Sequence, residues 1–421
     1  MADDRIIVGL DIGTSFIRVA IGEVDDMGEL HIIATSAQKS AGLRNGVIVN
    51  IEDAKDAIKE AIEAAETKGG VLVTSVIASI GGSQIESDNS SGIVPIRNNS
   101  KGGSAYVTSS DVEKVIDIAT AINYPADREK IHVIPQDYLV DDIGHIPDPI
   151  NRLGFKLEAK VHIITASKSL IQNMKSCISR AEYGLDGVML KTLAATQAVC
   201  HDDELELGSI IIDLGAGTTD VIVILNGAPV STASVQVGGN LVTNDISVVN
   251  SIPVAAAEKI KLEYGCCWPN GIQNDVDVIL PGVGGRAPEL TKKSEIAKIV
   301  TARMMQIFTM VKQAVIKNTS DSIKQLAGNI ILTGGGAQME GVVELAQEVF
   351  KTSSVRCGVP ESLGGLQEEY RKPEFATAIG LVVANKGLVE TRDTRRRPKK
   401  AAGQKGETKE NIFKRLRKLF F

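Results

Sequence analysis

Two acidic residues, Asp11 and Asp213, stand at matching places in two similar segments of the chain. Residues 6–15 read IIVGLDIGTS and residues 209–220 read SIIIDLGAGTTD, so each carboxylate follows an apolar run and precedes glycine and hydroxylated residues. Backbone N–H groups in such a turn form a concavity for anions. A carboxylate beside it suits Mg²⁺, which binds nucleotides through few protein oxygens and several waters. Two such turns facing each other would clamp a nucleoside triphosphate with its magnesium ion.

Each segment can also be an ordinary β-hairpin with a glycine-rich turn. The occurrence of both, with Asp and Gly at matching offsets, favours the phosphate clamp. Other phosphate motifs do not fit, because the chain has no G-x-x-x-x-G-K-[ST] and residues 215–220 lack the third glycine of a dinucleotide fingerprint. Each turn is also followed by a β-rich run, at 16–21 and 221–225, rather than by a helix.

A third glycine cluster, residues 334–336, ends another apolar run. Glycines there would let the backbone lie flat against a nucleoside, where a side chain would clash. Glu258 and Lys261 share one face of an expected helix and could meet a ribose or a base edge. Taken alone, that pair is better explained as a solvated ion pair between residues three apart.

Composition limits the remaining possibilities. A chain of 421 residues, 43% of them hydrophobic, can bury more than one core, and we expect at least two lobes. Aromatic residues make up only 4%, which argues against folds that stack nucleic-acid bases. The five cysteines have no C-x-x-C spacing and suggest reduced, cytosolic thiols. We expect neither a signal peptide nor a spanning helix, since no uncharged apolar run approaches the roughly 20 residues that a bilayer requires.

Charge is distributed unevenly along the chain. Residues 392–421 contain twelve Lys and Arg against three Asp and Glu, a net charge of +9, so residues 1–391 carry −15 of the total of −6. At the helical angle of 100° per residue, the apolar residues of the tail fall on one arc and the basic ones opposite: Ile412, Phe413, Leu416, Leu419 and Phe420 against Lys414, Arg415, Arg417 and Lys418. Such a helix lies in the interface of an anionic membrane. Docking on the protein's own body and binding of nucleic acid are the alternatives.

Local patterns predict several helices. Residues 52–68 carry apolar residues at helical spacing, and residues 294–317 form the longest such pattern. Ser110 and Glu113 read as a capping box that opens a short helix within a Ser/Asn/Gly-rich region, which we interpret as a small inserted subdomain. Gly380 stands in the middle of the small-residue helix 376–389, where close packing would explain it.

The three glycine-containing motifs resemble the phosphate-1, phosphate-2 and adenosine motifs of the actin/Hsp70/sugar-kinase superfamily. Residues 185–199 and 375–381 match its two connecting helices. Within it the chain most resembles the FtsA family of bacterial actin-like division proteins, which tether tubulin-like FtsZ to the membrane. The supporting segments are LDGV at 185–188, AExxKxxYG at 257–265 and LxxxVHIIT at 157–165.

This resemblance implies a role for each matching residue. Asp11 and Asp213 would hold Mg²⁺, mainly through water. The phosphates of ATP would be held by Gly13, Thr14, Ser15, Gly215, Gly217 and Thr218, and its nucleoside by Glu258, Lys261, Gly335 and Gly336. Many relatives have a lysine where Phe16 stands here, with Arg18 following. Because no residue is identifiable as the water activator, we expect ATP binding with at most slow hydrolysis.

The resemblance also implies an α/β fold with two lobes. The first-lobe core would comprise residues 1–83, 163–195 and 373–391, and residues 84–162 would form the inserted subdomain. The second-lobe core would comprise residues 196–237 and 327–372, with a further subdomain at 238–326. Residues 392–408 would be a flexible basic linker and residues 409–421 the membrane-targeting helix.

The function implied is that of an ATP-binding division protein that polymerises on the cytoplasmic face of the membrane at the division site. It would anchor FtsZ filaments of the Z ring, through a surface near residues 238–326, and recruit later division proteins. Its partners would be FtsZ, further copies of itself and anionic inner-membrane lipids, with no nucleic acid. A small-molecule kinase or phosphatase of the same fold, or a component of another membrane machine such as PilM, are the alternatives, and the tail argues against both. A chaperone ATPase would need a further substrate-binding domain.

Overall fold

The computed structural model describes residues 5–96, 104–319, 329–361 and 363–387. Two five-stranded sheets with the same topology form its centre. In the first sheet the order is β13-β6-β1-β2-β3 and in the second it is β16-β15-β14-β19-β20. Each sheet has three antiparallel strands from consecutive hairpins and two parallel strands added beside the first of them. The two lobes are therefore built on the same plan, and the expected two-lobed α/β fold is confirmed.

The strands form where the sequence is apolar. The bounds in the first sheet are β1 (Ile6–Ile12), β2 (Phe16–Val24), β3 (Leu30–Lys39), β6 (Ser75–Ile80) and β13 (Gly184–Leu190). In the second they are β14 (Ser209–Leu214), β15 (Thr219–Leu225), β16 (Ala228–Val235), β19 (Ile330–Thr333) and β20 (Val355–Cys357). A short hairpin, β4 (Leu43–Arg44) and β5 (Val47–Ile48), follows β3. The central strands β1 and β14 are almost wholly buried, as expected for strands covered on both faces.

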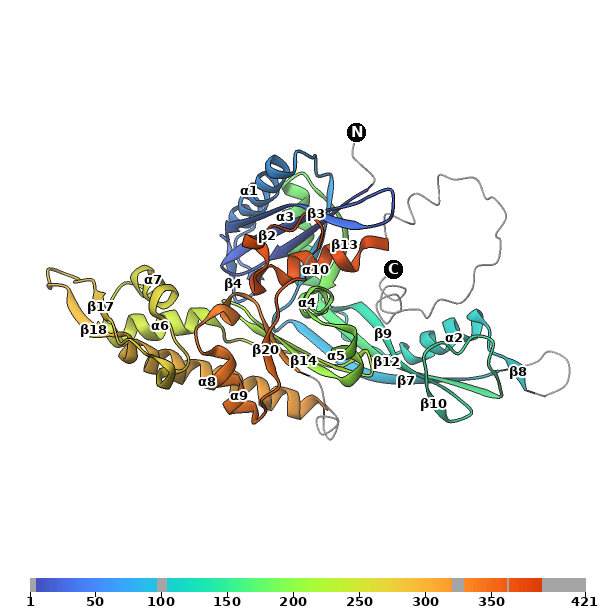
Figure 1. The fold of residues 1–421 in the computed structure, drawn as a ribbon. Helices are drawn as coiled ribbons and strands as arrows, with labels where there is room; N and C mark the ends of the chain where they lie inside the picture. The colour runs from blue at the N-terminus through green and yellow to red at the C-terminus, as the bar shows by residue number, and fades with distance from the viewer. Residues whose placement is uncertain (1–4, 97–103, 320–328, 362, 388–421) are drawn as a thin grey trace.

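Helices cover both faces of each sheet. The outer face of the first sheet packs on α1 (Ile51–Gly69) and α3 (Lys168–Arg180). Between the two sheets lie α4 (Lys191–Val199) and α10 (Ala376–Ala384), whose buried residues share one core with both sheets (Figure 1). A Cβ added at Gly380 would lie 1.8 Å from the carbonyl oxygen of Ala194, so close helix packing does explain this glycine.

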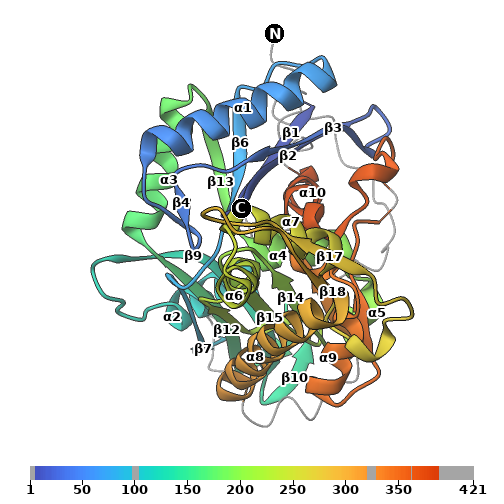
Figure 2. The same cartoon turned by 90° about the vertical axis from the view of Figure 1, so that its left-hand side faces the viewer.

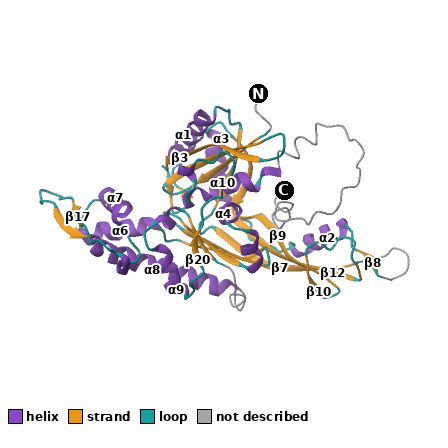
Figure 3. Ribbon diagram, viewed as in Figure 1, coloured by secondary structure: helices purple, strands orange, loops and turns teal. Residues whose placement is uncertain are grey.

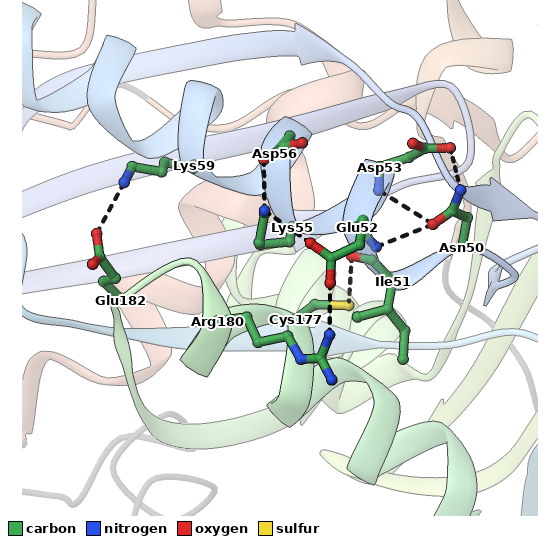
Figure 4. Close-up of polar contacts among 10 residues, drawn as sticks. All are labelled: Asn50, Ile51, Glu52, Asp53, Lys55, Asp56, Lys59, Cys177, Arg180 and Glu182. Carbon is green, nitrogen blue, oxygen red and sulfur yellow. Dashed lines mark hydrogen bonds and ion pairs between the residues drawn. The ribbon is translucent and has the colours of Figure 1, made fainter.

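Polar contacts fix the N-terminus of α1 against the neighbouring elements (Figure 4). The side chain of Asn50 caps the helix by accepting hydrogen bonds from the N–H groups of Glu52 and Asp53. Arg180 of α3 donates a 2.6 Å hydrogen bond to Glu52, and Lys59 pairs with Glu182 at 2.9 Å. These contacts hold α1 and α3 together over the first sheet.

The inserted subdomain is a separate sheet with the order β10-β9-β12-β7, covered by one helix (Figure 3). Its elements are β7 (Ile85–Pro95), β8 (Ala105–Tyr106), α2 (Ser109–Ala119), β9 (Arg128–Val140), β10 (Ile143–Ile146), β11 (Leu153–Gly154) and β12 (Lys156–Ser167). The capping box of α2 is formed by Thr108 and Asp111, not by Ser110 and Glu113 as the sequence suggested. The helix begins two residues earlier than expected because Thr108 adopts the extended conformation of an N-cap.

The second lobe carries its own subdomain at the end opposite the insertion (Figures 1 and 2). It contains α6 (Gly239–Asn250), α7 (Val254–Tyr264), β17 (Asp277–Leu280), β18 (Glu289–Lys292) and the long α8 (Lys293–Thr319). The lobe also includes α5 (Asp202–Leu207) and α9 (Val342–Phe350). Short 3₁₀ turns occur at Pro269–Gly271, Gly335–Gln338, Glu368–Tyr370 and Pro373–Phe375. No helix in the described ranges has both the length and the apolar character required to cross a bilayer.

Candidate functional site

Asp11 lies at the end of β1, where the first sheet faces the second lobe. Its Oδ1 accepts a 2.7 Å hydrogen bond from Ser79 Oγ and lies 2.9 Å from Lys191 Nζ. Burial alone would raise the pKa of this carboxyl, but the charge of Lys191 and the two hydrogen bonds outweigh it and hold the pKa below its usual value. Asp11 is therefore a buried, ionised carboxylate.

Asp213 occupies the equivalent place at the end of β14. Burial raises the pKa of its carboxyl to about 7, Lys191 opposes the shift, and the nearby charges of Asp220 and Asp11 add to it. The two candidate metal-binding carboxylates thus come from opposite lobes and influence each other. An added cation would relieve their mutual repulsion.

The first turn follows β1. Gly13 donates a hydrogen bond to the carbonyl oxygen of Phe16, and Thr14 Oγ1 accepts one of 2.9 Å from the backbone N–H of Gly46. The backbone carbonyl of Ser15 accepts from Ser40. Both Thr14 and Ser15 remain partly exposed.

The second turn has the same form and lies against the first. Gly215 donates to the carbonyl oxygen of Thr218, just as Gly13 donates to that of Phe16. A Cβ added at Gly217 would lie 2.8 Å from Thr14 Oγ1, so the two turns approach each other directly across the lobes. The hydroxyl of Thr218 donates a 3.0 Å hydrogen bond to Asp220. The structure therefore places the turn that contains Gly13, Thr14 and Ser15 against the turn that contains Gly215, Gly217 and Thr218.

Glu258 and Lys261 of α7 form the intrahelical ion pair that the sequence allowed, with 2.8 Å between Nζ and Oε2. Lys261 is nevertheless buried, and its Nζ also donates to Thr243 Oγ1 and to the carbonyl oxygen of Gly239. Gly239 in turn donates to the carbonyl oxygen of Gly215. Lys261 is thus connected to the second phosphate turn, which a solvated surface pair would not be.

The three glycines at the end of β19 differ in the space that surrounds them. Gly334 has a φ of +80°, and a Cβ there would lie 2.2 Å from Asp213 Oδ1. A Cβ at Gly336 would lie 2.8 Å from Leu214 Cβ. At Gly335 a Cβ would meet no described atom within 4 Å, so no protein contact requires this glycine.

Lys191 is the site residue that the sequence reasoning missed. It begins α4, donates a 3.1 Å hydrogen bond to the carbonyl oxygen of Ile12 and lines a small cavity with Gly46, Ser79 and Gly81. Burial would lower the pKa of its ammonium, but the charges of Asp11, Asp213 and Asp220 raise it instead. The sequence placed Lys191 inside a connecting helix at 185–199, but residues 184–190 form strand β13 and the helix begins only at Lys191. Its partner Asp11 lies 180 residues earlier in the chain, so no local pattern indicated the contact.

Many relatives have a lysine at the position of Phe16, and Arg18 is the nearest basic residue in the sequence here, but its side chain is engaged elsewhere. Its guanidinium pairs with Glu374 at 2.5 Å and lies over the rings of Phe16 and Phe375, with 5.2 and 5.5 Å to their centroids. Glu374 follows Pro373, whose carbonyl oxygen accepts hydrogen bonds from Gly334 N and Thr333 Oγ1. Arg18 therefore links the first hairpin to the segment that supports the glycine cluster.

Comparison with solved structures identifies the class of fold. The chain superposes on a PilM–PilN type IV pilus biogenesis complex with a TM-score of 0.63 and 16% identity, covering 90% of this chain and 97% of the other. It superposes on MreB5 of Spiroplasma citri bound to ADP with a TM-score of 0.55 and 14% identity, covering 92% and 98%. The two lobes and their paired turns define an actin-like fold.

Sequence comparison identifies the family. The model of cell division protein FtsA matches residues 210–380, and that of the SHS2 domain inserted in FtsA matches residues 82–165. Cell division protein FtsA of Borreliella burgdorferi is 40% identical over 380 residues, which are 90% of each chain. This chain belongs to the FtsA family of cell division proteins.

Proposed function

We propose that this chain is an ATP-binding division protein that polymerises on the cytoplasmic face of the cell membrane, anchors FtsZ filaments there and recruits later division proteins. The main support for nucleotide binding is that the two glycine-containing turns lie against each other. Thr14 and Gly217, from opposite lobes, lie within contact distance and present glycines, hydroxyls and backbone N–H groups at one place. Such a concavity suits the phosphates of a nucleotide.

The nucleoside would lie along the glycine cluster and α7. The open space at Gly335 supports this assignment, because a side chain there would fill the space that a ligand needs. Lys261 and Glu258 lie beside the second turn and would contact the ribose or the base. The bound ADP of the actin-like MreB5 is consistent with a nucleotide in this fold.

The residues present also fit a magnesium ion. Asp11 and Asp213 supply one carboxylate from each lobe, and Mg²⁺ typically uses one or two carboxylates together with substrate phosphates and water. Among the described residues, no group of three or more His, Cys, Asp or Glu is arranged to hold a metal without such help. When bound, the ion would neutralise phosphate charge, while Asp11 and Asp213 would orient it from the two lobes.

Membrane attachment is assigned to the tail, which lies outside the described residues. Its basic and apolar residues would bind anionic lipids, and several tails on one polymer would bind through avidity. FtsZ would bind the subdomain near residues 238–326. ATP would then control conformation and assembly rather than drive metabolism.

Sedimentation with liposomes that contain phosphatidylglycerol tests this function. The full chain should pellet, more strongly with Mg-ATP, and should bring FtsZ with it, whereas a chain ending at Thr408 should remain in the supernatant. A full-length Phe413→Ser/Leu416→Ser variant should also remain in the supernatant. Its matched control, Asn411→Ser, should pellet. If every form stays in the supernatant under all conditions, the anchoring role is wrong and the small-molecule kinase alternative becomes the one to test.

A further inference from the structure

Lys191 places a buried positive charge where helix geometry does not favour one. It is the first residue of α4, and the N-terminus of a helix carries the positive end of its dipole. Its side chain is only 16% exposed. A Cβ at Gly81 would lie 2.9 Å from Lys191 Cδ, so a glycine provides the room for the lysine to reach inward. The ammonium is retained at an electrostatic cost that its partners must offset.

The partners are the carboxylates of the interlobe site. Lys191 Nζ lies 2.9 Å from Asp11 Oδ1, and the charges of Asp213 and Asp220 act on it as well. Asp220 is already satisfied by hydrogen bonds from Gly82 N and Thr218 Oγ1. Lys191 thus provides the larger cationic contribution to a group of three carboxylates that come from both lobes, and the charge of Arg18 adds a smaller one at Asp11 and Asp213.

A second lysine in the same helix position offers a direct comparison. Lys168 is the first residue of α3, but it extends to the surface and donates a 2.7 Å hydrogen bond to the carbonyl oxygen of Ala126. Lys293, the first residue of α8, instead pairs with Glu340 at 2.6 Å, so lysines that begin helices in this fold occur with and without a carboxylate partner. Lys191 differs from both because its partner, Asp11, lies in the interlobe site.

We propose that Lys191 is a built-in counter-ion of the nucleotide site and competes with Mg²⁺ for Asp11, so that the site holds a nucleotide even without the metal. This inference rests on the proposed function. Asp11 Oδ1 already accepts hydrogen bonds from Lys191 and Ser79, so this oxygen is occupied before any ion binds. An ammonium in this position offsets the repulsion between the carboxylates and the phosphates when no divalent ion does. Metal binding at Asp11 requires the ammonium to give way or the ion to bind through water.

The decisive quantity is the metal dependence of nucleotide affinity. The dissociation constant of a fluorescent ATP analogue is measured with excess Mg²⁺ and again with EDTA, for the native chain and for Lys191→Met. The dissociation constant in EDTA divided by that in Mg²⁺ is the ratio to compare. This ratio should be at least about tenfold larger in Lys191→Met, because removing one partner of a buried charge pair weakens metal-free binding by that order or more. Lys191→Arg keeps the charge and should keep the native ratio. Lys168→Met, the matched control, should leave the ratio unchanged.

Thermal unfolding of each variant shows whether it is folded. If Lys191→Met is not, Lys191→Gln retains a hydrogen-bond donor for Asp11 and Ile12 and should give the same increased ratio. An unchanged ratio in the folded neutral variants, or a Lys191→Arg ratio equal to that of Lys191→Met, would overturn the counter-ion role while leaving the proposed function intact. A native chain that binds no analogue in either buffer would instead overturn the proposed function itself.

Discussion

Asn89 Nδ2 donates a 2.9 Å hydrogen bond to the carbonyl oxygen of Val230, and this contact joins the inserted subdomain to the second lobe. Asn89 lies on the edge strand β7, and Val230 lies on the edge strand β16. Two residues away, Ser87 Oγ lies within hydrogen-bonding distance of both the N–H and the carbonyl oxygen of Thr232. At this junction, side chains of β7 therefore bind backbone groups of β16.

Asn89→Ala should destabilise this junction. Asn89 Oδ1 also accepts hydrogen bonds from Gln136 and pairs with His162 Nδ1, so the truncation leaves several polar groups without their partner. Because Asn89 is itself exposed, we expect a loss of about 0.5–1.5 kcal/mol in the free energy of unfolding, the usual net contribution of an intramolecular hydrogen bond. Urea denaturation measures it, and Ser91→Ala, at an exposed position of the same strand, is the control. Equal midpoints for the two variants would show that the junction contributes nothing.

Gly334→Ala should lower stability, whereas Gly335→Ala should lower nucleotide affinity. At Gly334 the positive φ and the contact with Asp213 predict a loss of stability of about 1–3 kcal/mol. At Gly335 the added methyl group meets no protein atom, so stability should be retained while affinity for a nucleotide falls. Thermal unfolding and binding of a fluorescent ATP analogue, measured on both variants, separate the two effects. Undiminished affinity in Gly335→Ala would remove Gly335 from the proposed site.

Gly380→Ala should destabilise the core between the sheets, although alanine is the better helix former by about 1 kcal/mol. The new Cβ would overlap the carbonyl oxygen of Ala194, and separating α10 from α4 would disturb the core that both sheets share. Overpacking of this kind typically costs about 1–3 kcal/mol. A lowered midpoint in urea is the expected result. A raised midpoint would mean that helix propensity, not packing, dominates at this position.

The sequence predicted the two hairpins well because each depends on local information. An apolar run followed by Asp, Gly and hydroxylated residues predicts a buried strand and its turn, and both were found. Gly380 was also anticipated, since a glycine in a small-residue helix indicates close packing. The role of Lys191 was not, because it depends on the parallel pairing that sets β13 beside β6 and β6 beside β1. Only that order places the start of α4 next to Asp11. The burial of Lys261 was missed for the same reason, as its contacts come from α6.

Two buried histidines of the inserted subdomain should make stability depend on pH. His132 Nε2 accepts a hydrogen bond from Leu190 N, and His162 Nδ1 lies 2.7 Å from Asn89 Oδ1. Burial lowers the pKa of His132 to about 3, with a smaller effect from the nearby His162, and burial lowers the pKa of His162 to about 4.

In the unfolded chain both imidazoles titrate near pH 6.5. Between pH 6.5 and 4 the unfolded state therefore binds more protons than the folded state, and the free energy of unfolding falls as the pH falls. Each histidine contributes about 1.4 kcal/mol per pH unit well inside this window and nothing above it. Carboxylates also titrate there, so the informative measurement is the difference between the native chain and His162→Gln. Its urea midpoint should decrease less steeply with falling pH than that of the native chain, and His145→Asn, at an exposed position, is the control. Parallel pH dependences for the native chain and His162→Gln would show that folding does not lower the pKa of His162.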